Sequence, residues 1–280
     1  MIIVLGVLLV WMLAIASGYV GWKRLGPSHW IRIDPAMPTP YHTRFASIIV
    51  EPRAHMHLET VLRNVHETTP IEWPIYVVHG LTNGDMVREC VARSVGTRRA
   101  VFYIRLHASN LGPNQYNRLF LTERFWDTVA ADHVLVFQTD VAICRPITPD
   151  AVLTMQKYGY LGCQTSSNTA RPAWGGEMAR HVFGGVGGMS FRNVSFMKRC
   201  IQSMSPKDRA TIPEDVAFSA CQASMRPVPP QTLASFCWQG DWSSGMKTPT
   251  PLGVHKPSLM NASSKSKMTR HCPAVSHLLT

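Results

Sequence analysis

The sequence lacks the cysteine patterns that zinc-binding modules require. Its 280 residues contain seven cysteines, with no CxxC pair and no spacing typical of a zinc site. Because seven is odd, the cysteines cannot all pair within one chain. Most are also compatible with a role as small core residues, so they do not decide the redox compartment.

Nucleic-acid-binding motifs are missing as well. The net charge of +11 comes from 28 Lys+Arg against 17 Asp+Glu, but no RNP motif, zinc finger, helix-turn-helix or arginine-rich run accompanies it. The positive residues are scattered along the chain, and no internal repeat is visible. We therefore expect no nucleic-acid partner. An anionic membrane surface or a phosphorylated substrate also accounts for a basic chain.

Charged residues are absent from the first 20 positions, which consist mainly of apolar side chains. Together with Gly21 and Trp22 this run reaches the length that spans a bilayer as a helix. We predict an uncleaved transmembrane signal anchor over residues 1–22, followed by a proline-rich stem over residues 23–45. A cleaved signal peptide is the alternative, because Ala14-Ile-Ala16 resembles a cleavage site, although no basic region precedes it.

Residues 46–258 alternate between strand and helix patterns, which is typical of a mainly parallel α/β sheet with helices on both faces. The glycine-rich residues 163–188 predict a mobile loop beside the site. The polar, basic residues 259–280 predict a disordered tail. The expected strands are residues 45–50, 75–79, 100–106, 133–138 and 187–191, and the expected helices are residues 57–66, 114–129, 194–204 and two that start near Asp85 and Pro213.

Two features carry candidate chemistry. A buried-strand run ends at Asp140, and the carboxyl edge of an α/β sheet is where ligands bind. Near the C-terminus, His255 and Lys256 lie between a glycine and a proline. Asp and His are ligands that Mn²⁺ or Mg²⁺ accepts, and such an ion with a lysine neutralises a leaving diphosphate. Turn capping by Asp140 and a surface-turn position for His255 are the alternatives.

The chain also resembles a family. It is similar to a glycosyltransferase-like family of unknown function (domain of unknown function 5672), of the GT-A type. The shared segments, in order over residues 46–257, are Ile49-Val-Glu-Pro-Arg53, Val61-Leu-Arg-Asn64, His79-Gly80, Tyr116-Asn117, Phe125-Trp126, Phe137-Gln-Thr-Asp140 with Cys144-Arg145, Gly187-Gly188 with Ser190 and Arg192, Glu214-Asp215, and Gly253 with His255-Lys-Pro257.

The resemblance implies a GT-A-like Rossmann-type domain that transfers a sugar from a nucleotide-sugar donor to a glycan, protein or lipid acceptor. Gln138 stands where metal-dependent GT-A enzymes carry the first acid of their Asp-x-Asp motif. Val186 and Ser258 depart from the family's usual Asn and Trp. A catalytically inert relative that binds sugars or nucleotides is the alternative function.

The resemblance and the residues together assign the site. As catalytic residues we expect Glu214 and Asp215, one of them as a general base or to orient the sugar, although two acids also suit a helix start. The metal ligands are expected to be Asp140 and His255. Donor binding is expected from Glu51, Arg53, Asn64, Gln138, Thr139, Gly187, Gly188 and Lys256.

The sequence signals on localisation conflict. Lys23, Arg24 and Arg32 follow the anchor, and the positive-inside rule would keep the following domain in the cytosol. The sequons Asn193-Val-Ser195 and Asn261-Ala-Ser263 would be usable only in a lumen. Because enzymes of the resembled type work in the lumen, we expect a single-pass Golgi or ER protein with a lumenal catalytic domain.

Overall fold

The computed structural model describes residues 31–165, 185–241 and 250–279. The expected anchor over residues 1–22, the first part of the stem and most of the expected loop over residues 163–188 lie outside these ranges. No helix within the described ranges is long and apolar enough to cross a membrane. Residues 33–280 belong to one compact unit.

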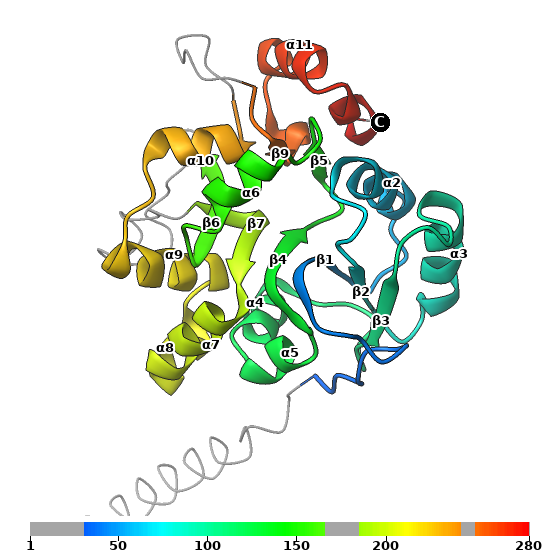
Figure 1. The fold of residues 1–280 in the computed structure, drawn as a ribbon, viewed down its shortest axis with the longest axis vertical. Helices are drawn as coiled ribbons and strands as arrows, with labels where there is room; N and C mark the ends of the chain where they lie inside the picture. The colour runs from blue at the N-terminus through cyan, green and yellow to red at the C-terminus, as the bar shows by residue number, and fades with distance from the viewer. Residues whose placement is uncertain (1–30, 166–184, 242–249, 280) are drawn as a thin grey trace, which may run out of the picture. The chain divides into compact units, whose positions relative to one another are not determined.

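The described strands form one nine-stranded sheet in the order β3-β2-β1-β4-β7-β6-β8-β9-β5 (Figure 1). The four strands at the β3 end are parallel, as the alternation of strands and helices predicts. β7 then runs antiparallel to both of its neighbours. The strands are β1 (Thr43–Glu51), β2 (Ile75–His79), β3 (Val101–Arg105), β4 (Ala131–Phe137), β5 (Val141–Ile143), β6 (Tyr160–Thr165), β7 (Val186–Asn193), β8 (Cys237–Gln239) and β9 (Gly253–His255).

The parallel strands are buried on both faces, which is why they read as continuous apolar runs. Ile49 and Val77 pack into the cluster that contains residues of α2 (Leu58–Thr68) and α3 (Gly84–Ser94). The adjacent Ile48 and Tyr76 are fully buried and, because side chains alternate along a strand, lie on the opposite face. The sheet is therefore mainly parallel and covered by helices.

The expected single helix over residues 114–129 is two helices, α4 (Pro113–Phe120) and α5 (Glu123–Asp127). Thr122 is extended between them, with φ −120° and ψ 123°. The Trp126 indole N–H donates to the Phe120 carbonyl at 2.8 Å. This bond gives a partner to a carbonyl group at the end of α4 that has none within the helix. The remaining helices are α6 (Pro149–Met155), α7 (Val194–Ser203), α8 (Pro206–Thr211), α9 (Glu214–Met225), α10 (Pro230–Phe236), η4 (Pro257–Leu259), α11 (Ala262–His271) and η5 (Pro273–Leu278).

The C-terminal segment differs from the disordered tail that its composition predicts. It contains α11 and η5, and Met268, Cys272 and Val275 are fully buried. A disulfide joins Cys272 to Cys144, just after β5. A few apolar side chains and one covalent tether therefore order a segment that is otherwise polar.

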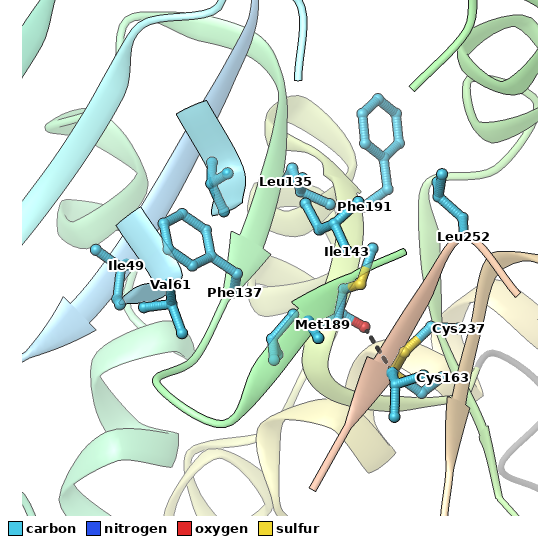
Figure 2. Packing of buried hydrophobic residues seen from close by; sticks show 14 of the residues in the cluster. Ile49, Val61, Leu135, Phe137, Ile143, Cys163, Met189, Phe191, Cys237 and Leu252 are labelled. Atoms are coloured by element: carbon cyan, nitrogen blue, oxygen red, sulfur yellow. Dashed lines mark hydrogen bonds between the residues drawn. A yellow bond between two sulfur atoms is a disulfide. The ribbon is translucent and has the colours of Figure 1, made fainter. Parts of the chain in front are cut away.

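Three disulfides pair six of the seven cysteines, and Cys90 is buried and unpaired. Besides Cys144–Cys272, Cys163 of β6 bonds to Cys237 of β8, and Cys200 of α7 bonds to Cys221 of α9. Figure 2 shows the Cys163–Cys237 bond among the buried side chains around Met189 and Leu252. The structure thus gives the cysteines a cross-linking role that their spacing did not reveal.

The Cys144–Cys272 bond closes a loop with a sequence separation of 128 residues. The double variant Cys144→Ala/Cys272→Ala, which leaves no new thiol, should lose about 2–5 kcal/mol of unfolding free energy in urea denaturation. Cys90→Ala is the control, because it removes a buried thiol without removing a cross-link. A free thiol at Cys272 in non-reducing peptide mapping would contradict the assignment.

Candidate active site

The candidate site lies where the strand order of the parallel sheet reverses. From β1 the chain continues to β2 and β3 on one side, whereas β4 lies on the other side of β1. Ligands of open α/β sheets bind at such a switch point, outside the carboxyl ends of the strands. β1 ends at Glu51 and β4 ends at Phe137, so Arg53 and the Gln138-Thr-Asp140 segment emerge there.

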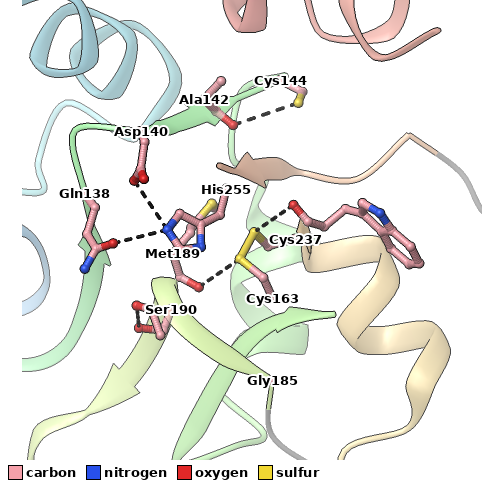
Figure 3. The surroundings of a disulfide bond; sticks show 12 residues. Gln138, Asp140, Ala142, Cys144, Cys163, Gly185, Met189, Ser190, Cys237 and His255 are labelled. Atoms are coloured by element: carbon pink, nitrogen blue, oxygen red, sulfur yellow. Dashed lines mark hydrogen bonds and ion pairs between the residues drawn. A yellow bond between two sulfur atoms is a disulfide. The ribbon is translucent and has the colours of Figure 1, made fainter. Parts of the chain in front are cut away.

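The pairing of two short strands brings His255, which lies near the C-terminus, to this edge of the sheet. β5 and β9 are antiparallel, with Val141 opposite His255, and the Lys256 amide donates to the Asp140 carbonyl at 3.0 Å. Asp140 Oδ1 lies 3.3 Å from His255 Nε2, and His255 Nε2 lies 3.1 Å from Gln138 Oε1 (Figure 3). The structure therefore brings together the two residues that we expected to share a metal ion.

Gly188 creates the space for His255, whose side chain is only 3% exposed. A Cβ atom at Gly188 would coincide with the His255 imidazole, and one at Gly253 would coincide with the Met189 sulfur. A larger residue would require the His255 imidazole to move in the first case and the Met189 side chain to move in the second. The glycines of the shared segments thus act by close packing, which is compatible with their expected place beside the donor.

The charge of Asp140 is held in place by its neighbours. Burial raises the pKa of Asp140, but the hydrogen bond with His255 and the electrostatic interactions with His255 and Lys256 outweigh it and lower the pKa overall. Asp140 is therefore ionised at neutral pH. Its Oδ1 atom is buried and, apart from the contact with His255, has no partner among the described residues.

Lys256 adopts a backbone conformation that a non-glycine residue seldom takes, with φ 51° and ψ 55°. Such a conformation costs about 1–3 kcal/mol and persists only where the surroundings impose it. Here the Lys256 amide bonds to Asp140 and Pro257 follows. The strained turn sends the chain directly from His255 into η4.

Glu51 and Arg53 form a pair on the β1 side of the crevice. Arg53 Nε donates to Glu51 Oε1 at 2.8 Å, and Arg53 also donates to Oε2 at 2.9 Å. The Glu51 side chain is buried, whereas the Arg53 side chain is 53% exposed. The charge of Asp140 contributes to the raised pKa of Arg53, after the Glu51 hydrogen bond as the largest cause. Arg53 thus points an oriented guanidinium towards this edge.

Asn83 is a site-forming residue that the sequence did not single out. Its Nδ2 group donates to the carbonyls of Glu51 and Arg53 at 2.9 and 2.7 Å, and its Oδ1 accepts from the Gly80 amide at 2.8 Å. A Cβ atom at Gly80 would collide with the carbonyls of Pro52 and Ala108. This network fixes the loops that follow β1 and β2.

Asn64, expected to bind the donor, has a different position. Its Nδ2 donates to the Ile143 carbonyl at 3.0 Å, and its Oδ1 accepts from the Ile143 amide at 2.7 Å. The Asn64 side-chain amide thereby bonds both backbone groups of Ile143 in β5, as a neighbouring strand would. These bonds give Asn64 a structural role beside the site.

The expected catalytic pair splits into two environments. Glu214 is buried, and its oxygens accept from Arg192 at 2.7 and 3.1 Å. A carboxylate held in this way is badly placed to take a proton from a substrate. Asp215 is partly exposed, and its Oδ2 accepts from the Gly187 amide at 3.3 Å, one residue before the glycine under His255. Asp215 is thus the more exposed of the two carboxylates.

The guanidinium of Arg192 is enclosed by four aromatic rings, at 4.8 to 5.9 Å from its central carbon. The rings are those of Phe120, Trp126, Tyr160 and Phe218. Arg192 Nε also donates to Ser190 Oγ at 2.8 Å, and Ser190 Oγ donates to the Gly187 carbonyl at 3.0 Å. This buried cluster fixes the start of β7.

Tyr116 is a second site residue that the candidate set omitted. Burial raises the pKa of its hydroxyl, the charge of Glu214 adds to the effect, and the Gln138 side chain opposes it. The only sequence signal was its place in a segment shared with the resembled family. Tyr116 thus links α4 to the residues at the end of β4.

The described part of the chain forms no metal centre from protein ligands alone. The described residues contain no group of three or more His, Cys, Asp and Glu side chains that could hold an ion. Asp140 and His255 are two such side chains, and Gln138 adds an amide oxygen beside them.

Comparison with known proteins identifies the family. Residues 103–255 match the family described as "Protein of unknown function (DUF5672)", and the chain belongs to this family. This confirms the family part of the resemblance. No curated protein matches the chain.

Several solved structures are similar at low identity. The mannosyltransferase PcManGT from Pyrobaculum calidifontis, in complex with GDP-Man and Mn²⁺, is 17% identical over 78% of this chain and 62% of its own, with a TM-score of 0.47. The mannosyltransferase Ktr4p from S. cerevisiae is 10% identical over 73% and 72%, with a TM-score of 0.45. S. aureus TarS 1-349 in complex with UDP-GlcNAc is 13% identical over 64% and 53%, with a TM-score of 0.43. The chain thus spans about half the length of that TarS fragment.

The packing of His255 on Gly188 yields a direct test. Gly188→Ala should lower the free energy of unfolding by about 1–3 kcal/mol, because the new methyl group must displace the imidazole and β9 with it. Gly112→Ala is the matched control, since a Cβ there meets only Gln115 Oε1 at an ordinary 3.7 Å. Equal stabilities of the two variants in urea denaturation would contradict the packing.

Proposed function

We propose that this chain is a glycosyltransferase that moves a sugar from a nucleotide-sugar donor to a glycan, protein or lipid acceptor. The supporting observation is the convergence of Asp140, His255 and Lys256 at the switch point of an α/β sheet. An acid, an imidazole and an ammonium at that edge suit a metal-bound diphosphate better than an uncharged ligand.

The side chains present fit a divalent ion such as Mn²⁺ or Mg²⁺. Bonds of about 2.1 Å place adjacent ligands of one ion about 3 Å apart. The distances of 3.1 and 3.3 Å from His255 Nε2 to Gln138 Oε1 and Asp140 Oδ1 agree with this spacing. The buried Asp140 Oδ1, which lacks another partner among the described residues, is a free ligand atom. His255 would carry its proton on Nδ1 while Nε2 binds.

An ion at this position would neutralise the diphosphate as it leaves. The chain's own residues would supply the rest of the donor site. Lys256 and Arg53 would contact the phosphates from opposite sides, and Glu51 would hold the Arg53 guanidinium in its present orientation. Thr139, Gly187 and Gly188 would line the donor, as the family resemblance implies.

On the acceptor side, Asp215 is the better candidate for the general base. It is the partly exposed member of the pair, and it accepts a hydrogen bond from the Gly187 amide at the start of β7, next to Gly188, which packs on His255. Glu214 would instead hold Arg192, and so fix Asp215 at the first turn of α9.

A second function has one observation in its favour. Gln138 carries no charge where metal-dependent enzymes of this type carry an acid, which weakens attraction for a cation. A relative that binds nucleotide sugars without transferring them would have the same fold. Hydrolysis of a nucleotide sugar in the presence of Mn²⁺ separates the two functions, because only an active enzyme releases the nucleoside diphosphate.

We also propose that the domain is lumenal and that residues 1–22 anchor it in a Golgi or ER membrane. The support is the set of three disulfides, because disulfides persist in oxidising compartments and are rare in the cytosol. This argument opposes the positive charges that follow residue 22. We give the three disulfides, which involve six cysteines, more weight than these positive charges.

Asp140→Asn tests the site at nearly constant side-chain volume. Transfer from the donor should fall about 100- to 1,000-fold, because the variant loses the charge that holds the ion, while the thermal unfolding midpoint changes little. Asp85→Asn is the control, since Asp85 is fully exposed on α3. Unchanged Mn²⁺-dependent donor binding in Asp140→Asn would contradict the assignment of Asp140 as a metal ligand. Full activity in EDTA would exclude a role for the metal but would leave the proposed reaction class standing.

Protease protection tests the topology. In intact microsomes the domain after residue 32 should resist added protease, and detergent should abolish that resistance. The full chain should also remain in the membrane pellet after an alkaline carbonate wash. Digestion of the domain without detergent would overturn the lumenal orientation, and release of the full chain by carbonate would overturn the anchor.

A further inference from the structure

The two sequons of the chain lie at structurally comparable positions. Asn193 is the N-cap of α7 and Asn261 is the N-cap of α11. In each case Oδ1 accepts from the amide three residues later, at 2.8 Å from Phe196 N and 2.8 Å from Ser264 N. An N-linked glycan replaces one hydrogen of Nδ2 and leaves Oδ1 as a cap acceptor. The surroundings of Nδ2 therefore decide which sequon can be used.

At Asn193 the amide nitrogen is engaged. Asn193 Nδ2 donates to His133 Nε2 at 3.1 Å, and the side chain is partly buried. His133 in turn stacks on Phe191 with ring centroids 5.5 Å apart. A sugar on Asn193 would have to displace His133 from this packed position. One Nδ2 hydrogen is thus engaged and the side chain that carries the other is partly buried, so the fold disfavours a glycan at this sequon.

At Asn261 the amide nitrogen is available. Asn261, Ala262 and Ser263 are all exposed, and Nδ2 makes no hydrogen bond to any described residue. The Asn261 backbone amide donates to Asp241 Oδ1 at 2.6 Å, which a glycan on the side chain leaves intact. The sequon therefore presents its acceptor atom to solvent while the cap of α11 stays formed.

We propose that Asn261 is an N-glycosylation site and that Asn193 is not. The three disulfides support the compartment in which the modification occurs. The co-substrate is a lipid-diphosphate-linked oligosaccharide of the secretory pathway. Asn261 Nδ2 forms a bond to C1 of the first sugar and loses one proton, while the C1–O bond breaks and the lipid diphosphate leaves with the electron pair. The inference rests on the proposed lumenal orientation, but not on the transferase activity.

The test uses the full chain expressed in eukaryotic cells and treated with peptide N-glycosidase. The wild-type band should shift by one glycan, and mass spectrometry should find Asn261 converted to Asp. Ser263→Ala should abolish the shift, as should Asn261→Asp, which keeps an oxygen to cap α11. Ser263→Thr should retain the shift, and Ser195→Ala, which destroys only the other sequon, should leave it unchanged.

Three outcomes would overturn the proposal. A shift that survives in Ser263→Ala, or an Asp at position 193 after enzyme treatment, would show that the wrong sequon was chosen. No shift in a chain that resists protease in intact microsomes would overturn the site alone. No shift in a chain that is digested there would overturn the site together with the lumenal orientation.

Discussion

The candidate site depends on the pairing of β5 with β9, two strands of three residues each. This pairing places Val141 opposite His255 and so brings Asp140 to the imidazole. Three residues form too few hydrogen bonds to hold a strand alone. The bond from Cys144 to Cys272 fixes the chain just after β5, and the close packing of Gly253 on Met189 fixes β9. Covalent and steric constraints thus replace strand length.

The second constraint is the buried ion pair of Arg192 and Glu214. A buried pair contributes little net stability, because removing two charges from water offsets their attraction. Here the aromatic rings around the guanidinium and the hydrogen bond to Ser190 recover part of that cost. The result is one fixed geometry at the start of β7, which positions the glycine under His255 and the Asp215 carboxylate beside it.

The sequence predicted the long strands because β1, β2 and β4 are buried on both faces and read as continuous apolar runs. It missed β5, β8 and β9, since strands of three residues take their conformation from their partners, and it also missed the six-residue β6. The same limit applies to side chains. Asp140 and His255 could be proposed as metal ligands from their residue types and positions. The hydrogen bonds of Asn64 to β5 and of Glu214 to Arg192 could not be recognised, because they join distant parts of the chain. The cysteine spacing did not reveal that six of seven pair.

The proposed cation would change the local charge balance of the site. The Glu51–Arg53 pair is neutral as a unit, and Asp140 and Lys256 cancel, although the chain as a whole is strongly basic. Without an ion, these four side chains offer no net positive charge to a diphosphate. If His255 stays neutral as a ligand, a divalent ion would add two positive charges to these four side chains, which matches a diphosphate that carries at least two negative charges. Donor and metal should therefore bind cooperatively, each weakly without the other.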